Sequence, residues 1–182
     1  QAHHTEACTE TLSLLSTSVK AQAVTAYDYL TTLRKDCPSF HKSIYSLGEF
    51  AVKLKIEKAT TPQDKEKYVR DLLKLYDEHD QYFPNNGAGN KMKKGLALFE
   101  NKIGTSDEVF QLLDVAFKTD YANFKYAKAM YVYFEILVNN HKANKGVELQ
   151  QVFDKYDDIS KKLDEEEKEL SEENDGFLTR EE

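Results

Sequence analysis

The most reactive side chains in this sequence are those of two cysteines, Cys8 and Cys37. Cys8 lies near the start of the first predicted helix and Cys37 at the end of the second, so antiparallel packing of the two helices brings them together. A disulfide there closes a loop of about 30 residues and stabilises the fold by roughly 3–4 kcal/mol in a chain-entropy treatment. Two free, buried thiols are the alternative. Neither cysteine belongs to a close CxxC pair, so the spacing does not predict a zinc site.

The chain begins with Gln1-Ala2-His3, followed by His4. With a free amine, this order of residues can bind Cu²⁺ or Ni²⁺ in a square plane through the amine, two amides and the imidazole. An N-terminal Gln tends to cyclise, which removes the amine. Histidines beside a terminus carry little functional information, and we predict no metal site and no cofactor.

Carboxylates are frequent near the C-terminus, at Asp154, Asp157, Asp158 and 165–167. Paired carboxylates catalyse acid–base reactions only in a shaped, partly buried cleft, whereas these residues follow a long polar helix face. The loop 86–90 lacks the Lys-Ser/Thr of a phosphate-binding loop, and no Ser-His-Asp or Cys-His pattern stands out. We therefore predict that the protein is not an enzyme.

Aromatic residues gather in the segment 124–134, which contains Tyr126, Tyr131 and Tyr133. An aromatic groove can hold a flat hydrophobic ligand such as haem, with a tyrosine as the iron ligand. Aromatic side chains also fill the interfaces between packed helices. Packing is the favoured interpretation, and a ligand groove is the alternative.

These residues belong to a chain whose apolar positions recur with helical period almost throughout, which predicts an all-α protein. The expected helices cover about 5–18, 22–35, 41–58, 62–83, 91–102, a segment after the Thr105–Glu108 capping box, 126–142 and 147–171. Residues 172–182 show no periodicity. We expect a single domain over residues 1–171, followed by a flexible tail or the start of a missing segment at 172–182.

The spacing of small residues and prolines indicates repeats. Pro38 lies where a tetratricopeptide unit of about 34 residues ends, and Leu47-Gly48 falls on the Leu-Gly pair of the next unit. Pro84 plays the same role in a further unit. This predicts a right-handed superhelical stack of helical hairpins, built from irregular tetratricopeptide-like repeats. A generic helical bundle is the alternative.

Charge and hydropathy exclude two classes of partner. The net charge is −7, without the basic footprint that nucleic-acid binding needs. No stretch approaches about 18 consecutive apolar residues, so no membrane span is predicted. A first residue other than Met fits removal of a signal peptide, and it fits a terminus cut elsewhere equally well.

Three stretches of the chain carry a family resemblance. They are Ala7-Cys8-Thr9 to Asp36-Cys37-Pro38, Lys67-Tyr68-Val69 to Leu75-Tyr76-Asp77 with Tyr82-Phe83-Pro84, and Asp107-Glu108-Val109-Phe110 to Phe153-Asp154-Lys155-Tyr156-Asp157. In these stretches the chain resembles a family of larger tetratricopeptide-type proteins of Bacteroidetes, from which the segment 174–177 departs. The resemblance implies an N-terminal piece of a periplasmic or envelope-associated protein, exported with a cleaved signal peptide, and it favours the disulfide over free thiols. It implies no activity, since the family has no defined molecular function.

We therefore predict a non-catalytic protein–protein interaction scaffold of the bacterial cell envelope, which binds a protein or peptide segment in a concave groove. The first helices of the repeats line such a groove, and Lys42, Tyr45 and Glu49 are the expected contacts. The alternative function is a carrier of a small hydrophobic ligand such as haem in the aromatic groove.

Overall fold

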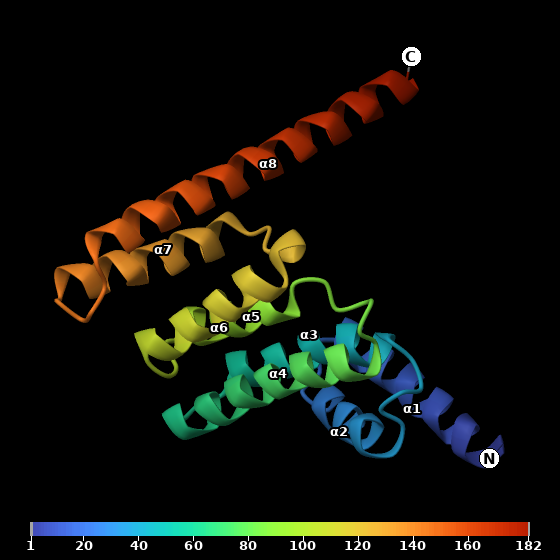
Figure 1. The fold of residues 1–182 in the computed structure, drawn as a ribbon. Coiled ribbons are helices and arrows are strands. Elements are labelled where there is room, and N and C mark those ends of the chain that lie inside the picture. The colour runs from blue at the N-terminus through green and yellow to red at the C-terminus, as the bar shows by residue number, and fades with distance from the viewer. Residues whose placement is uncertain (1, 182) are drawn as a thin grey trace. The chain divides into compact units, whose positions relative to one another are not determined.

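The structure is a computed structural model that describes the backbone of residues 2–181 and the side chains of residues 2–174. Over residues 2–181 it contains eight α-helices, one short 3₁₀ helix and no strand, so the predicted all-α class is confirmed (Figure 1). The chain divides into two compact units, Gln1–Gly104 and Thr105–Glu182. Each unit is described by itself.

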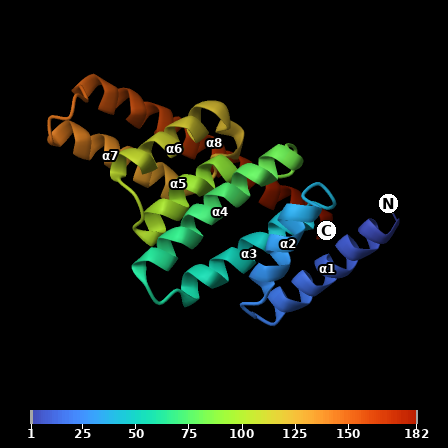
Figure 2. The ribbon, with the colours of Figure 1, turned by 90° about the horizontal axis from the view of Figure 1, so that it is seen from below.

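The first unit contains five helices. They are α1 (Ala2–Lys20), α2 (Ala26–Asp36), α3 (Ser43–Lys58), α4 (Pro62–Tyr82) and α5 (Asn90–Asn101). Each helix packs against the next one in the chain, and α1 also contacts α3. As a result α4 lies against both α3 and α5 (Figure 2). Short connections between amphipathic helices favour such antiparallel neighbours.

Local sequence signals define the start of α4 and the close packing of α3. Thr61 caps α4 by accepting a hydrogen bond from the Asp64 amide at 3.1 Å, and Pro62 is the first helical residue. In α3, a Cβ added at Gly48 would lie 2.7 Å from Cδ1 of Leu30 in α2. Gly48 thus lets α2 and α3 approach closely.

The second unit contains α6 (Ser106–Thr119), the 3₁₀ helix η1 (Tyr121–Asn123), α7 (Ala127–Lys142) and α8 (Leu149–Glu181). Thr105 caps α6 by accepting a hydrogen bond from the Glu108 amide at 3.2 Å. Helix α7 packs against both α6 and α8. Since α7 has 16 residues and α8 has 33, α7 can cover only part of the length of α8.

The structure forms two compact units that meet at Gly104, and the single domain over residues 1–171 stays a prediction. The tail expected at 172–182 is helical as far as Glu181, because α8 continues without a break beyond its last apolar periodic positions. The right-handed superhelical stack of tetratricopeptide-like repeats remains a prediction.

Candidate functional site

A hollow in the first unit contains two of the predicted partner contacts. We call it the Lys42 hollow; it has a volume of about 320 Å³ and is lined by Lys42, Ser43, Ser46, Glu49, His79, Asn86, Gly87, Ala88, Asn90 and Lys93. These residues come from α3 and Lys42 just before it, from the end of α4, from the loop 86–88 and from the first turn of α5. The structure therefore brings Lys42 and Glu49 to one polar surface.

The carboxylate of Glu49 has its hydrogen-bond and charge partners within the protein. Its carboxylate accepts hydrogen bonds from Lys53 Nζ at 2.8 Å and from the Tyr76 hydroxyl at 3.0 Å, and Lys93 Nζ lies 3.6 Å away. Burial acts to raise the pKa of Glu49, but the hydrogen bond and charge of Lys53 and the charge of Lys93 outweigh it, so the pKa is lowered. Glu49 is thus an ionised carboxylate that holds α3, α4 and α5 together.

Tyr45, the third predicted contact, is a core residue and not a surface one. Only 1% of it is exposed. Its ring stacks on His79 with centroids 5.2 Å apart, and its hydroxyl donates to the Pro38 carbonyl at 2.8 Å. Tyr45 follows the buried Ile44 and precedes the buried Gly48 by three positions, so it lies on the face of α3 that packs against α4. In this structure Tyr45 therefore offers a partner almost no contact area.

The three tyrosines of the predicted ligand groove do not come together. Tyr126 and Tyr131 are 50% and 64% exposed, whereas Tyr133 is fully buried. Two helical positions separate Tyr131 from Tyr133, which places them on opposite faces of α7. The groove expected from Tyr126, Tyr131 and Tyr133 is therefore not formed by these side chains.

Tyr133 lies instead at the centre of a buried polar group that sequence reasoning missed. Its hydroxyl donates to Asp114 of α6 and accepts from Lys155 Nζ of α8 at 2.7 Å. Lys155 Nζ is 4.7 Å from the centroid of the Tyr133 ring and 5.0 Å from that of Phe117. Burial is the main cause that raises the pKa of Tyr133, reinforced by Asp114, and burial lowers the pKa of Lys155. One feature of the sequence could have indicated this contact: Lys155 lies between Val152 and Ile159 on the otherwise apolar face of α8.

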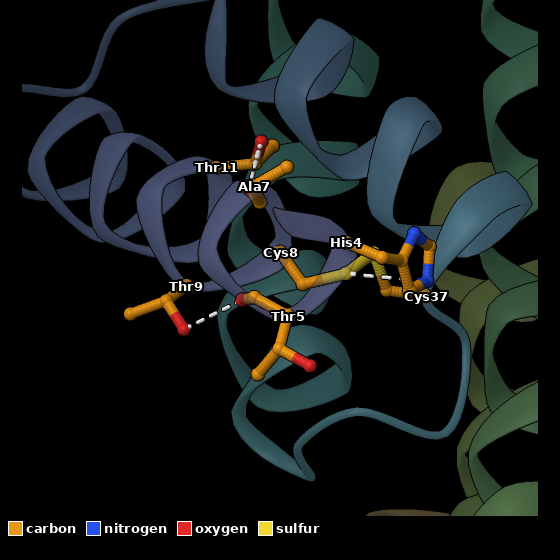
Figure 3. The surroundings of a disulfide bond; sticks show 7 residues. All are labelled: His4, Thr5, Ala7, Cys8, Thr9, Thr11 and Cys37. Atoms are coloured by element: carbon orange, nitrogen blue, oxygen red, sulfur yellow. Dashed lines mark hydrogen bonds between the residues drawn. A yellow bond between two sulfur atoms is a disulfide. The ribbon is translucent and has the colours of Figure 1, made fainter. Parts of the chain in front are cut away.

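The predicted disulfide is present in the first unit. Cys8 in α1 and Cys37 at the end of α2 are bonded, with a Cα–Cα distance of 6.2 Å (Figure 3). His4, one turn before Cys8, lies with Nε2 3.7 Å from Cys8 Sγ. The disulfide hollow beside them has a volume of about 370 Å³ and is lined by His4, Ala7, Cys8, Thr11, Thr32, Lys35, Asp36 and Cys37. The spacing of His4 and Cys8, four residues apart on a helix, was the signal for this contact.

Helix α8 carries the longest row of exposed apolar side chains in the described part of the second unit. This α8 stripe consists of Leu149, Phe153, Tyr156, Leu163 and Leu170, which are 50%, 55%, 59%, 43% and 60% exposed. Four of these residues recur at intervals of seven positions, the spacing that keeps one helix face against a partner helix. Ile159, on the adjacent face, is buried. Helix α8 therefore has one apolar face packed inside the unit and a second one exposed.

Acidic side chains accompany the α8 stripe. Residues 157–170 contain seven acidic and three basic side chains. Glu167 lies four residues after Leu163 and three before Leu170, so it is on the stripe itself, and Asp157 and Asp164 follow its edge. All three are exposed. The exposed apolar face is thus bordered by negative charge.

No helix in the described residues is long and apolar enough to cross a membrane. A disulfide is typical of proteins from oxidising compartments. Comparison of the chain with protein-family models, with curated proteins and with solved structures found no match in any of the three. Membership of the Bacteroidetes family therefore remains a prediction from the resemblance.

Proposed function

We propose that this protein is a non-catalytic interaction module, and that its main binding surface is the α8 stripe. The observation that carries the proposal is the exposure of Leu149, Phe153, Tyr156, Leu163 and Leu170 along one face of a single helix. Contiguous exposed apolar surface of this kind is typical of sites that bind other proteins. An amphipathic helix whose apolar residues recur at heptad spacing would match this surface.

Apolar burial on the stripe supplies part of the free energy that a complex needs. Complete burial of one large apolar side chain contributes about 1.5–3 kcal/mol, so five half-exposed ones offer on the order of 4–8 kcal/mol. Association itself costs about 4–15 kcal/mol, so apolar side chains of the partner and charge pairs must supply the rest. Such a surface suits a partner that binds through several such rows or through added charge pairs.

Charge selects the class of partner. Asp157, Asp164 and Glu167 border the stripe, so a partner helix with Lys or Arg beside its apolar row gains favourable contacts. A second copy of this chain would bring the same acidic border against itself, which disfavours self-association. The occupant we propose is therefore a basic amphipathic helix of another protein.

The disulfide and the resemblance to envelope proteins support an extracytoplasmic location for this module. The Lys42 hollow, which is polar, is a second candidate binding surface of the proposed scaffold. Reversal of charge at Lys42 tests the hollow independently of α8, because Lys42 is exposed. Reversal at Glu49 also breaks hydrogen bonds within the unit, so its effect on stability must be measured beside its effect on binding.

The decisive experiment uses two synthetic helical peptides with the same heptad leucines, one with lysine flanks and one with glutamate flanks. Fluorescence anisotropy measures their binding to the full chain and to Leu163→Asp and Val115→Asp. Val115 of α6 is 49% exposed and lies off the stripe, so it is the matched control for Leu163 at 43%.

We expect the lysine-flanked peptide to bind at least about tenfold more tightly than the glutamate-flanked one, equivalent to about 1.4 kcal/mol. Leu163→Asp should abolish this binding and Val115→Asp should retain it. Equal loss in both variants, or no preference between the peptides, would overturn the proposal. Light scattering that shows dimers sensitive to Leu163→Asp would instead assign the stripe to a second copy of the chain.

A further inference from the structure

The disulfide in the first unit is part of a three-residue cluster of metal-ligating side chains. A ring nitrogen of His4 and the Sγ atoms of Cys8 and Cys37 all lie within 4.8 Å of one another. Cys8 and Cys37 are buried, whereas His4 is exposed (Figure 3). The disulfide hollow gives the cluster an open side toward solvent.

We propose that reduction of the Cys8–Cys37 disulfide converts this cluster into a metal site for Zn²⁺ or a chemically similar divalent ion. Two cysteine thiolates and one imidazole would supply three ligands. The fourth position would face the disulfide hollow, where water or a small exogenous ligand can enter. Three protein ligands with one open position are a known arrangement for zinc, and thiolate and imidazole are the donors that zinc prefers.

The chemistry balances with an ordinary thiol reductant. A dithiol attacks the disulfide through a mixed disulfide, becomes a cyclic disulfide itself, and leaves Cys8 and Cys37 as two thiols. Binding of the ion then displaces one proton from each thiol. The same two sulfur atoms can either form the disulfide or bind the metal ion, but not both. The redox state of the cysteines therefore decides whether the metal can bind.

The geometry requires only local rearrangement. Zinc bonds of about 2.3 Å to sulfur and 2.0–2.1 Å to nitrogen imply N···S separations of about 3.5 Å in a tetrahedron. The observed distance from His4 Nε2 to Cys8 Sγ is 3.7 Å. After reduction the two sulfur atoms must move apart, and the hollow of about 370 Å³ beside them provides the space.

The helices that carry the ligands are held together by more than the disulfide. Leu15 of α1 is fully buried, as are Leu30 and Leu33 of α2, and α1 also contacts α3. Apolar burial of this kind keeps α1 against α2 when the S–S bond opens. His4 and Cys8 lie one turn apart on the same helix, so their relative position does not depend on the bond at all.

The test uses tag-free full chain, reduced with a phosphine, desalted without oxygen and titrated with Co²⁺, whose thiolate complexes absorb strongly in the near ultraviolet. The phosphine is oxidised to its oxide as water supplies the oxygen and the two thiol protons. The variants are His4→Ala, the matched control His3→Ala and Cys37→Ser. Circular dichroism follows the helical content of each sample.

We expect one Co²⁺ per reduced chain, displaced by Zn²⁺, and no thiolate absorption in the oxidised chain. His4→Ala should weaken binding by at least about tenfold, since removal even of an outer-shell partner costs about 10–100-fold in affinity. His3→Ala should bind as the unmodified chain does, and Cys37→Ser should lose most of the absorption. The inference is overturned by equal binding to His4→Ala and His3→Ala, by absent binding, or by a loss of helix on reduction that metal does not restore.

Discussion

Arg34 of α2 forms a two-pronged ion pair with Glu78 of α4, in which Nε lies 2.7 Å from Oε2 and Nη2 3.2 Å from Oε1. The third nitrogen of the guanidinium, Nη1, donates to Asp71 Oδ2 at 2.9 Å, and the same oxygen accepts from the Tyr27 hydroxyl at 2.8 Å. The Arg34 side chain is 11% exposed. This network ties α2 to α4 across the first unit.

Replacement of Arg34 should therefore destabilise the first unit. Arg34→Met leaves Asp71 and Glu78 partly buried without their cation, and we expect a loss of about 2–3 kcal/mol in the free energy of unfolding. Arg70→Met is the matched control, since that side chain is 40% exposed, and should change stability by less than about 0.5 kcal/mol. Urea denaturation followed by circular dichroism measures both. Equal effects would show that the network contributes nothing beyond surface charge.

The lowered pKa of Glu49 predicts an acid-dependent loss of stability. A carboxyl group whose folded pKa lies below its ordinary value of 4.5 stabilises the fold above that value and loses this contribution as the pH falls through the folded pKa. Glu49→Gln should therefore be less stable than the unmodified chain at pH 7, and the difference should shrink below about pH 4. Denaturation midpoints from pH 3 to 7 measure it, with the exposed Glu57→Gln as control. A difference that does not vary with pH would contradict the prediction.

The hydroxyl of Tyr133 should stabilise the second unit. Tyr133→Phe keeps the buried ring but removes the acceptor for Lys155 and the donor to Asp114, so we expect a loss of about 1–2 kcal/mol. Tyr131→Phe removes an exposed hydroxyl from the same helix and should cost less than about 0.5 kcal/mol. Thermal or urea unfolding compares the two. If the two substitutions have the same effect, the buried polar group is not a source of stability.

The disulfide should stabilise the first unit and leave the second unchanged. Replacement of both cysteines by serine removes a cross-link between residues 29 positions apart, worth roughly 3–4 kcal/mol in the chain-entropy treatment. Hydrogen exchange measured by mass spectrometry should show lower protection in α1 and α2 and unaltered protection in α6 and α7. Uniform loss of protection over both units would mean that they unfold together.

Much of the local structure is determined by the sequence alone. Helical periodicity predicts the all-α class, and the Thr61-Pro62 and Thr105–Glu108 signals predict the starts of α4 and α6 that the structure shows. These features depend on residues a few positions apart, whose relative placement in a helix is known without any tertiary information. The pairing of Cys8 and Cys37 needs two further assumptions beyond local spacing. These are the antiparallel packing of two consecutive helices and the family resemblance.

The tertiary structure alone decided which face of each helix is covered. Periodicity does not distinguish the apolar face that packs inside a unit from one that remains exposed, as α8 shows with Ile159 buried and Leu163 exposed. For the same reason Tyr45, predicted at a partner surface, is in the core, and Tyr133 is separated from Tyr131. The contacts of Lys155 with Tyr133 and of Arg34 with Glu78 join residues more than 20 positions apart. Such contacts depend on how helices pack in space, which short-range spacing along the chain does not encode.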